Sequence, residues 1–143
     1  MALLAAGALA YLVWLPSTLG RSGEAFQPER DPVKAARVGW LRGNSRPGDL
    51  VLVDDQVLAV AADRMVPPTL SDTSTVRALS GYLSVRQVER ATGDPRVRAV
   101  LLTRTFKNQP MYRPYVRWLN LHFRRVHPRA SLQGLAYVRR YGP

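Results

Sequence analysis

Residues 48–55 read GDLVLVDD, and the four apolar residues in their middle indicate the class of fold. A continuous apolar run of this length is typical of a strand buried on both faces, as the strands of parallel sheets are. Residues 97–102, VRAVLL, are a second such run, and residues 135–139, LAYVR, fit a third strand. With helical patterns between the runs, the sequence predicts a small three-layer α/β domain with a mostly parallel sheet. Its first two strands are expected to be central, parallel neighbours.

Local start signals place two of the helices that surround these strands. Asp31 and Pro32 fit the N-cap and the first residue of a helix that ends at residues 43–44. Ser84 and Gln87 have the spacing of a capping box, which predicts a second helix from this point to residue 93. The second of these helices lies between the first two predicted strands, where a crossover needs it.

The N-terminal end of the chain has a different character. Residues 2–15, ALLAAGALAYLVWL, carry no charge and no polar stripe. A helix of this length spans roughly 21 Å, short of the ~30 Å hydrocarbon core of a bilayer. Tyr11 and Trp14 stand near its end, where an interfacial aromatic belt would lie. We interpret residues 1–19 as the end of a transmembrane helix, residues 20–31 as a linker and residues 32–143 as a soluble α/β domain.

Composition limits the chemistry of the chain. Among 143 residues there is no cysteine, which excludes disulfides, thiolate zinc sites and a cysteine nucleophile. Only two histidines are present, so we expect no metal site, and we expect no cofactor either. The net charge is +11: residues 1–63 contribute 6 basic and 7 acidic side chains, and residues 64–143 contribute 15 and 3. This asymmetry favours an anionic partner, although a solvated basic face without a specific partner explains it equally well.

Residues 112–126 show the clearest amphipathic helical pattern and carry much of this charge. Tyrosine, leucine and phenylalanine share one face, and arginine dominates the opposite face. Such a helix fits anionic lipid headgroups or nucleic-acid phosphates. The simpler alternative is an ordinary helix that covers the sheet with its arginines in water. The candidate residues for membrane or anion contact are Arg113, Arg117, Trp118, Arg124 and Arg125.

Two adjacent carboxylates, Asp54 and Asp55, follow the first predicted strand. Open α/β sheets bind ligands at the carboxyl ends of their strands, and paired carboxylates there suit a divalent cation or a sugar. The alternative is that one caps the next helix and the other faces water. Pro67-Pro68 should turn the chain across the same edge, which predicts one candidate substrate-binding group. We assign no catalytic residue. The group contains Asp54, Asp55, Arg64, Asp72, Thr73, Ser74 and Arg77.

One longer stretch carries a resemblance. Residues 40–83 read WLRGNSRPGDLVLVDDQVLAVAADRMVPPTLSDTSTVRALSGYL. They resemble the C-terminal soluble domain of polytopic membrane glycosyltransferases of the protein-mannosyltransferase and lipid A aminoarabinose transferase type, in the GT-C superfamily. The shared elements are a W-L-R motif, a Pro-Gly-Asp turn, an apolar strand ending in Asp-Asp, an A-x-x-A-x-R helix, V-P-P-x-L, D-T-S and G-Y-L. A last membrane helix leading into this domain would also explain the apolar N-terminus.

The resemblance implies transfer of a sugar from a polyprenyl-phosphate donor on the extracytoplasmic side of the cell membrane. The family's catalytic carboxylate lies in a first extracytoplasmic loop to which no position here corresponds. The chain therefore looks like the end of such an enzyme, inactive alone, whose partners are a membrane lipid or polyprenyl-phosphate sugar and the missing transmembrane portion, with no nucleic acid. Two alternatives stay open: a small basic nucleic-acid-binding α/β protein, and a membrane-tethered interaction module.

Overall fold

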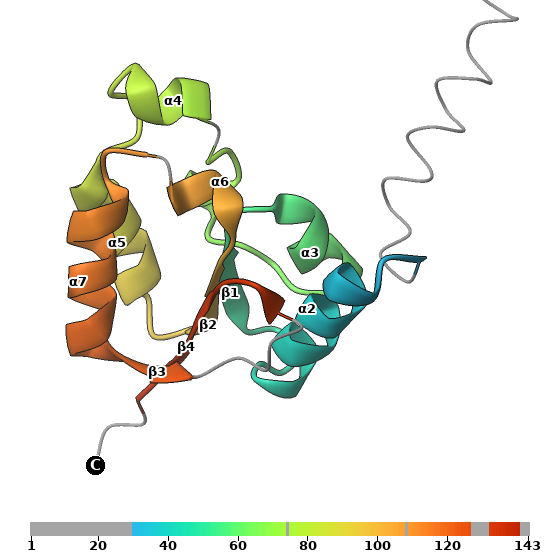
Figure 1. Ribbon diagram of the computed structural model, residues 1–143. Coiled ribbons are helices and arrows are strands. Elements are labelled where there is room, and N and C mark those ends of the chain that lie inside the picture. The colour runs from blue at the N-terminus through green and yellow to red at the C-terminus, as the bar shows by residue number, and fades with distance from the viewer. Residues whose placement is uncertain (1–29, 74, 108, 127–131, 141–143) are drawn as a thin grey trace, which may run out of the picture.

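A computed structural model of the chain describes residues 30–73, 75–107, 109–126 and 132–140. The expected apolar helix at residues 1–19 and most of the expected linker lie outside these described residues. Within the described ranges, no helix has both the length and the apolar character needed to cross a bilayer. The described chain forms an α/β domain around one four-stranded sheet (Figure 1).

The sheet is mixed in direction. Its strands are β1 (Leu50–Val53), β2 (Val97–Leu102), β3 (Phe123–Val126) and β4 (Leu135–Arg139), in the spatial order β1-β2-β4-β3. β1 and β2 are parallel neighbours, as predicted, with Val51 opposite Ala99. β4 runs antiparallel to both β2 and β3.

Two expectations about this sheet were therefore wrong. The sheet is not mostly parallel, because residues 127–134 are too short a connection for a crossover and join β3 to an antiparallel β4. β1 is not central either, because it lies at one end of the strand order. Its continuous apolar run arises from helices on both of its faces and not from a strand on each side.

The strand β3 was missed by the sequence pattern. Helix α7 covers Tyr112–His122, so the amphipathic helix ends four residues earlier than the predicted 112–126. Phe123 already has extended backbone angles, φ −124° and ψ 156°, and the strand begins there without a connecting loop. No glycine, proline or asparagine marks this boundary, and Phe123 is buried under either assignment. The pattern of buried residues alone therefore could not separate the two structures.

Helices cover both faces of the sheet (Figure 1). One face carries α2 (Pro32–Gly43) and α3 (Gln56–Ala61), and the other carries α5 (Val85–Gly93) and α7. The short elements η2 (Pro68–Leu70), α4 (Thr75–Leu79) and α6 (Arg104–Lys107) lie beyond the carboxyl ends of β1 and β2. The predicted small α/β domain is thus confirmed.

β1 shows why its sequence is apolar throughout. Leu50 and Leu52 belong to the core under α5 and α7, whereas Val51 and Val53 belong to the core under α2 and α3. Successive side chains of a strand point to opposite faces, so a sheet covered on both sides needs apolar residues at every position. All four are at most 3% exposed.

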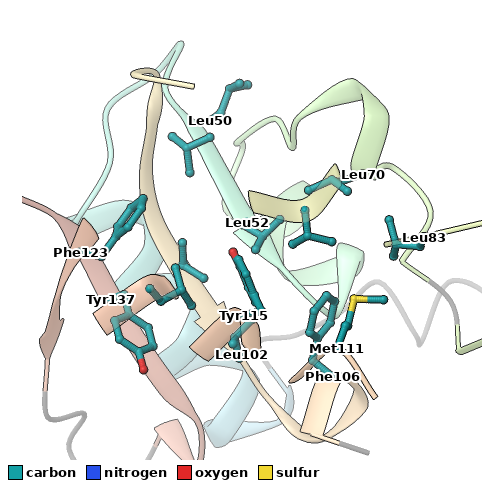
Figure 2. Close-up of a cluster of buried hydrophobic side chains, with 14 residues drawn as sticks. Leu50, Leu52, Leu70, Leu83, Leu102, Phe106, Met111, Tyr115, Phe123 and Tyr137 are labelled. Atoms are coloured by element: carbon teal, nitrogen blue, oxygen red, sulfur yellow. The ribbon is translucent and has the colours of Figure 1, made fainter. Parts of the chain in front are cut away.

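The larger core centres on Tyr115. Figure 2 shows the cluster extending from Phe106 and Met111 on one side of Tyr115 to Phe123 and Tyr137 on the other. The Tyr115 hydroxyl lies 2.8 Å from the Thr92 hydroxyl, which gives this buried polar group its partner. Burial raises the pKa of Tyr115 far above its usual range, so the ring stays neutral at all working pH values.

The helix caps match the signals in the sequence. The Asp31 carboxylate accepts hydrogen bonds from the backbone N–H groups of Val33 and Lys34, and Pro32 opens α2. Ser84 and Gln87 form the predicted reciprocal capping box at the start of α5. These caps satisfy backbone donors that the first turn of a helix leaves unpaired.

Asp94 provides a pH-dependent contribution to stability. Its carboxylate accepts hydrogen bonds from the side chain and the backbone N–H of Arg96, and these lower its pKa from 3.8 to about 2. A pKa lowered by folding stabilises the domain above the unfolded value, and this contribution is lost as the pH falls towards 2. We expect Asp94→Asn to lose stability less steeply than the parent between pH 4 and 2, measured by urea unfolding at each pH. Identical pH profiles would contradict this role.

Candidate functional site

Asp54 is a buried anchor and not a free ligand group. Its side chain is 6% exposed. The two carboxylate oxygens accept hydrogen bonds from the Thr103 backbone N–H at 2.9 Å, the Thr103 hydroxyl at 2.8 Å and the Phe106 backbone N–H at 3.0 Å. These donors lie where β2 passes into α6. The carboxylate therefore ties the end of β1 to the end of β2.

Asp55 takes the structural role that the sequence left open for one member of the pair. It is the N-cap of α3, and its side chain accepts a hydrogen bond from the Val57 N–H at 3.2 Å. The sequence also suggested that the other carboxylate of the pair faces water. That suggestion was wrong for Asp54, which is buried. Both adjacent carboxylates thus have backbone partners within the domain.

The segment around Asp72 lies at the same end of the sheet. Gln56, in the first turn of α3, donates to the Leu70 carbonyl at 3.0 Å. Gln109, which follows α6, donates to the carbonyl of the buried Thr73 at 3.4 Å. Asp72 is exposed, and Ser74 lies outside the described residues. The fold therefore places Thr73 close to the α6 segment that Asp54 holds.

The two arginines of the predicted group have different surroundings. Arg64 donates to the Ser45 hydroxyl and carbonyl, both at 2.9 Å, on the turn that precedes β1. The Arg64 guanidinium thus lies near the amino end of β1, away from Asp54. Arg77 stays with the loop and donates to the Asp72 carbonyl at 2.9 Å. The structure brings Arg77 to Asp72 but does not bring Arg64 to the predicted group.

One buried polar atom at this end has no partner within the described part of the chain. Gln109 is 4% exposed, and its side-chain carbonyl oxygen makes no hydrogen bond there. No group of three or more His, Asp or Glu side chains suited to a metal ion occurs among the described residues. At this end of the sheet, the Gln109 side-chain oxygen is therefore a hydrogen-bond acceptor without a donor, whereas the Asp54 carboxylate already accepts hydrogen bonds.

The residues of the predicted basic face lie on two elements, because α7 ends at His122 and β3 begins at Phe123. Arg113 and Arg117 are exposed on the helix, and Trp118 stacks on His122 with ring centroids 4.3 Å apart. Arg124 and Arg125 lie on β3, where consecutive side chains point to opposite faces of the sheet. The expectation that Arg124 shares a helical face with Arg113 and Arg117 was wrong.

A cleft in the described surface lies at the opposite end of the domain. It has a volume of about 470 Å³ and lies beside the C-terminal end of α2 and the amino ends of β1 and β2. Five arginines line it, against one carboxylate, for a formal charge of +4 (five minus one). The complete lining is Arg42, Gly43, Asn44, Ser45, Arg46, Asp49, Arg98, Arg124, Val138 and Arg139.

Arg139 borders this cleft and is fixed by backbone groups. Its guanidinium donates to the carbonyl groups of Val97 at 2.7 Å, Thr92 at 2.8 Å and Asp94 at 2.6 Å. It also lies 4.8 Å from the centroid of the Phe123 ring. Burial lowers the pKa of Arg139, and the nearby positive charge of Arg98 lowers it further. The positive charges of Arg98 and Arg139 thus repel each other.

Asp49 is the one negatively charged residue that lines the described cleft. The Asp49 carboxylate accepts the Arg46 backbone N–H at 2.7 Å and lies 3.7 Å from the Arg98 guanidinium. In the described part of the chain, the guanidinium groups of Arg46 and Arg124 make no hydrogen bond or ion pair. The cleft therefore combines positioned and uncommitted guanidinium groups, an arrangement that attracts anions.

Sequence reasoning identified only one residue of this cleft, Arg124, and placed it on the wrong element. The five arginines come from α2, the following turn, β2, β3 and β4, and no local spacing connects them. The excess of arginine in residues 64–143 was a signal for Arg98, Arg124 and Arg139 but not for Arg42 and Arg46. Comparisons of the chain with protein-family models, with curated proteins and with solved structures give no match.

Proposed function

We propose that the chain is an accessory domain of a membrane glycosyltransferase that uses a polyprenyl-phosphate sugar donor. The observation that carries this proposal is the resembling stretch, residues 40–83, with the apolar residues 2–15 before it. Within that stretch, Gly48 has a φ of +88° in the Pro-Gly-Asp turn. Asp54 and Asp55 both bind backbone groups. The motif thus has structural reasons to exist in a domain without its own catalytic site.

The direction of α2 supports an orientation relative to the membrane. Arg37 of α2 donates to the Leu132 carbonyl, close to the β4 residue that pairs with Leu102 at the end of β2. The N-terminus of α2 therefore lies at the carboxyl end of the parallel strands. Helix α4 lies beyond these carboxyl ends, and its last residue, Leu79, is 66% exposed; Tyr82, three residues later in the chain, is 74% exposed. In the proposal, this end packs against the transmembrane portion on the extracytoplasmic side.

The role assigned to the domain is to shape the acceptor side of the enzyme's site. Transfer chemistry needs a general base or metal-binding carboxylate beside the lipid phosphate. Both carboxylate oxygens of Asp54 already accept hydrogen bonds from Thr103 and Phe106. The proposal therefore leaves catalysis to the membrane portion.

The first test is the DNA upstream of the Met1 codon. We expect an open frame in the same register that encodes eight or more hydrophobic spans. A promoter and a ribosome-binding site directly before this codon would contradict the proposal.

The second test is a transfer assay with the purified chain in neutral detergent and several polyprenyl-phosphate sugars. We expect no turnover above a control without protein, because the proposed catalytic carboxylate belongs to another part of the enzyme. Turnover that disappears in Asp55→Ala would instead show a complete active site within this chain. Asp55 is the better probe because its cap contributes less to folding than the buried Asp54 does.

A further inference from the structure

The arginine cleft is built for a specific kind of ligand. Five arginine residues line it, and Val138 is the only large apolar residue in the set. A volume of about 470 Å³ lies within the ~300–1,000 Å³ that small-molecule sites occupy. The site therefore suits a small, strongly polar anion better than an apolar molecule.

The positions of the guanidinium groups are partly fixed before any ligand arrives. Arg139 is held by three backbone carbonyl groups on the Phe123 side of the sheet, so it contributes a fixed positive charge at the edge of the cleft. Asp49 offsets one positive charge near Arg98. An anion in the cleft would relieve the remaining repulsion without requiring these groups to reorganise.

Arg46 and Arg124 supply the groups that can close on the ligand. Arg46 is exposed on the turn after α2, and Arg124 is exposed on β3, across the cleft. Arg124 lies opposite Val138 in the strand register, which places it on the α2 face of the sheet. Guanidinium forks bind phosphate oxygens in pairs, and several such forks around one cleft favour more than one negative charge.

The described lining argues against a nucleic-acid strand as the occupant. Proteins that hold single strands stack bases on aromatic side chains, and no aromatic residue lines the described part of the cleft. A strand would also need a continuous basic groove, whereas Arg113 and Arg117 lie on α7, on the other side of the sheet. A compact phosphate ligand meets neither difficulty.

We propose that this cleft binds a compact ligand that carries a phosphate or diphosphate group with at least two negative charges. The ligand is either a free phosphate compound or the phosphate headgroup of a lipid. The inference rests on the arginine geometry alone and stands independently of the glycosyltransferase proposal. The cleft is also separate from the Asp54 end of the sheet.

The test is calorimetric titration of the full chain, in neutral detergent at fixed ionic strength, with inorganic pyrophosphate as the probe. The cleft pair is Arg46→Gln with Arg124→Gln. The control pair, Arg113→Gln with Arg117→Gln on α7, removes the same charge from exposed positions outside the cleft. We expect the cleft pair to weaken binding tenfold or more, since each charged hydrogen bond contributes about a factor of ten, and the control pair to leave it within about twofold.

A second probe identifies the source of the phosphate. Phosphatidylcholine vesicles with a minor share of phosphatidic acid present a phosphate monoester headgroup. Vesicle binding that the cleft pair alone loses identifies a lipid, and pyrophosphate binding without such a vesicle effect identifies a free ligand. The proposal is overturned if pyrophosphate does not bind or if both pairs weaken it equally. It is also overturned if a single-stranded oligonucleotide binds through the cleft in place of pyrophosphate.

Discussion

Replacing Asp54 with alanine is expected to lower the free energy of unfolding by about 3 kcal/mol or more. The carboxylate accepts hydrogen bonds from two backbone N–H groups and one hydroxyl, and it is almost completely buried. Hydrogen bonds to charged groups contribute about 1.5–3 kcal/mol each, and donors left buried without an acceptor add a further cost. Urea unfolding followed by circular dichroism measures the loss.

Asp55→Ala is the matched control for this experiment. It removes a carboxylate from the adjacent position, but its cap serves a single N–H group at the start of α3. Loss of an N-cap costs about 1 kcal/mol. If the two variants lose similar stability, Asp54 does not hold β1 to β2 in the way described. Asp54→Asn, which keeps an acceptor oxygen and the side-chain volume, should lie between the parent and Asp54→Ala.

Replacing Gly134 with alanine should produce the second large effect. An added Cβ would lie 2.6 Å from the carbonyl oxygen of Leu102 and 3.4 Å from its carbonyl carbon. Leu102 pairs with Leu135 in the sheet, so neither backbone can move without breaking the ladder between β2 and β4. Overpacking of this kind costs about 1–3 kcal/mol, and contact with backbone places it at the upper end.

Gly39→Ala provides the opposite outcome in the same assay. Gly39 lies inside α2, and nothing approaches its added Cβ within 4 Å. Alanine in a helix interior stabilises it by about 0.5–1 kcal/mol relative to glycine. We expect the unfolding midpoint to rise for Gly39→Ala and to fall for Gly134→Ala. A neutral Gly134→Ala would mean that β4 tolerates a shift away from β2.

The sequence predicted those parts of the fold that depend on local chemistry. Apolar runs without alternation identified β1 and β2, because burial on both faces removes the polar positions. The Asp31-Pro32 pair and the capping-box spacing of Ser84 and Gln87 identified the two caps. Parallel pairing of the two strands followed from the helices between them.

The direction of the remaining strands was not encoded locally. Phe123 is buried whether its backbone is helical or extended, so the helix pattern continued through β3. Once β3 is missed, β4 has no hairpin partner and is assigned to the parallel sheet by analogy with β1 and β2. A single wrong helix end therefore changed both the strand count and the sheet class.

The candidate sites show the same limit. The Asp54-Asp55 pair could be located at a strand end from sequence, but not its hydrogen bonds to Thr103 and Phe106, which lie about fifty residues away in the chain. The arginine cleft depends on Arg98, Arg124 and Arg139 meeting across β2, β4 and β3. Sites assembled across strands need the register, and register comes from the tertiary fold.

The two ends of the strand order give the domain resistance to aggregation. Exposed edge strands invite pairing with another chain. Beside β1, the Met65 carbonyl already accepts the Val51 N–H at 2.9 Å, so this edge is partly covered. At the other edge, β3 is only four residues long and carries the exposed Arg124 and Arg125. Two copies that met through β3 would bring four like charges together, and this repulsion favours separate domains even at high local concentration.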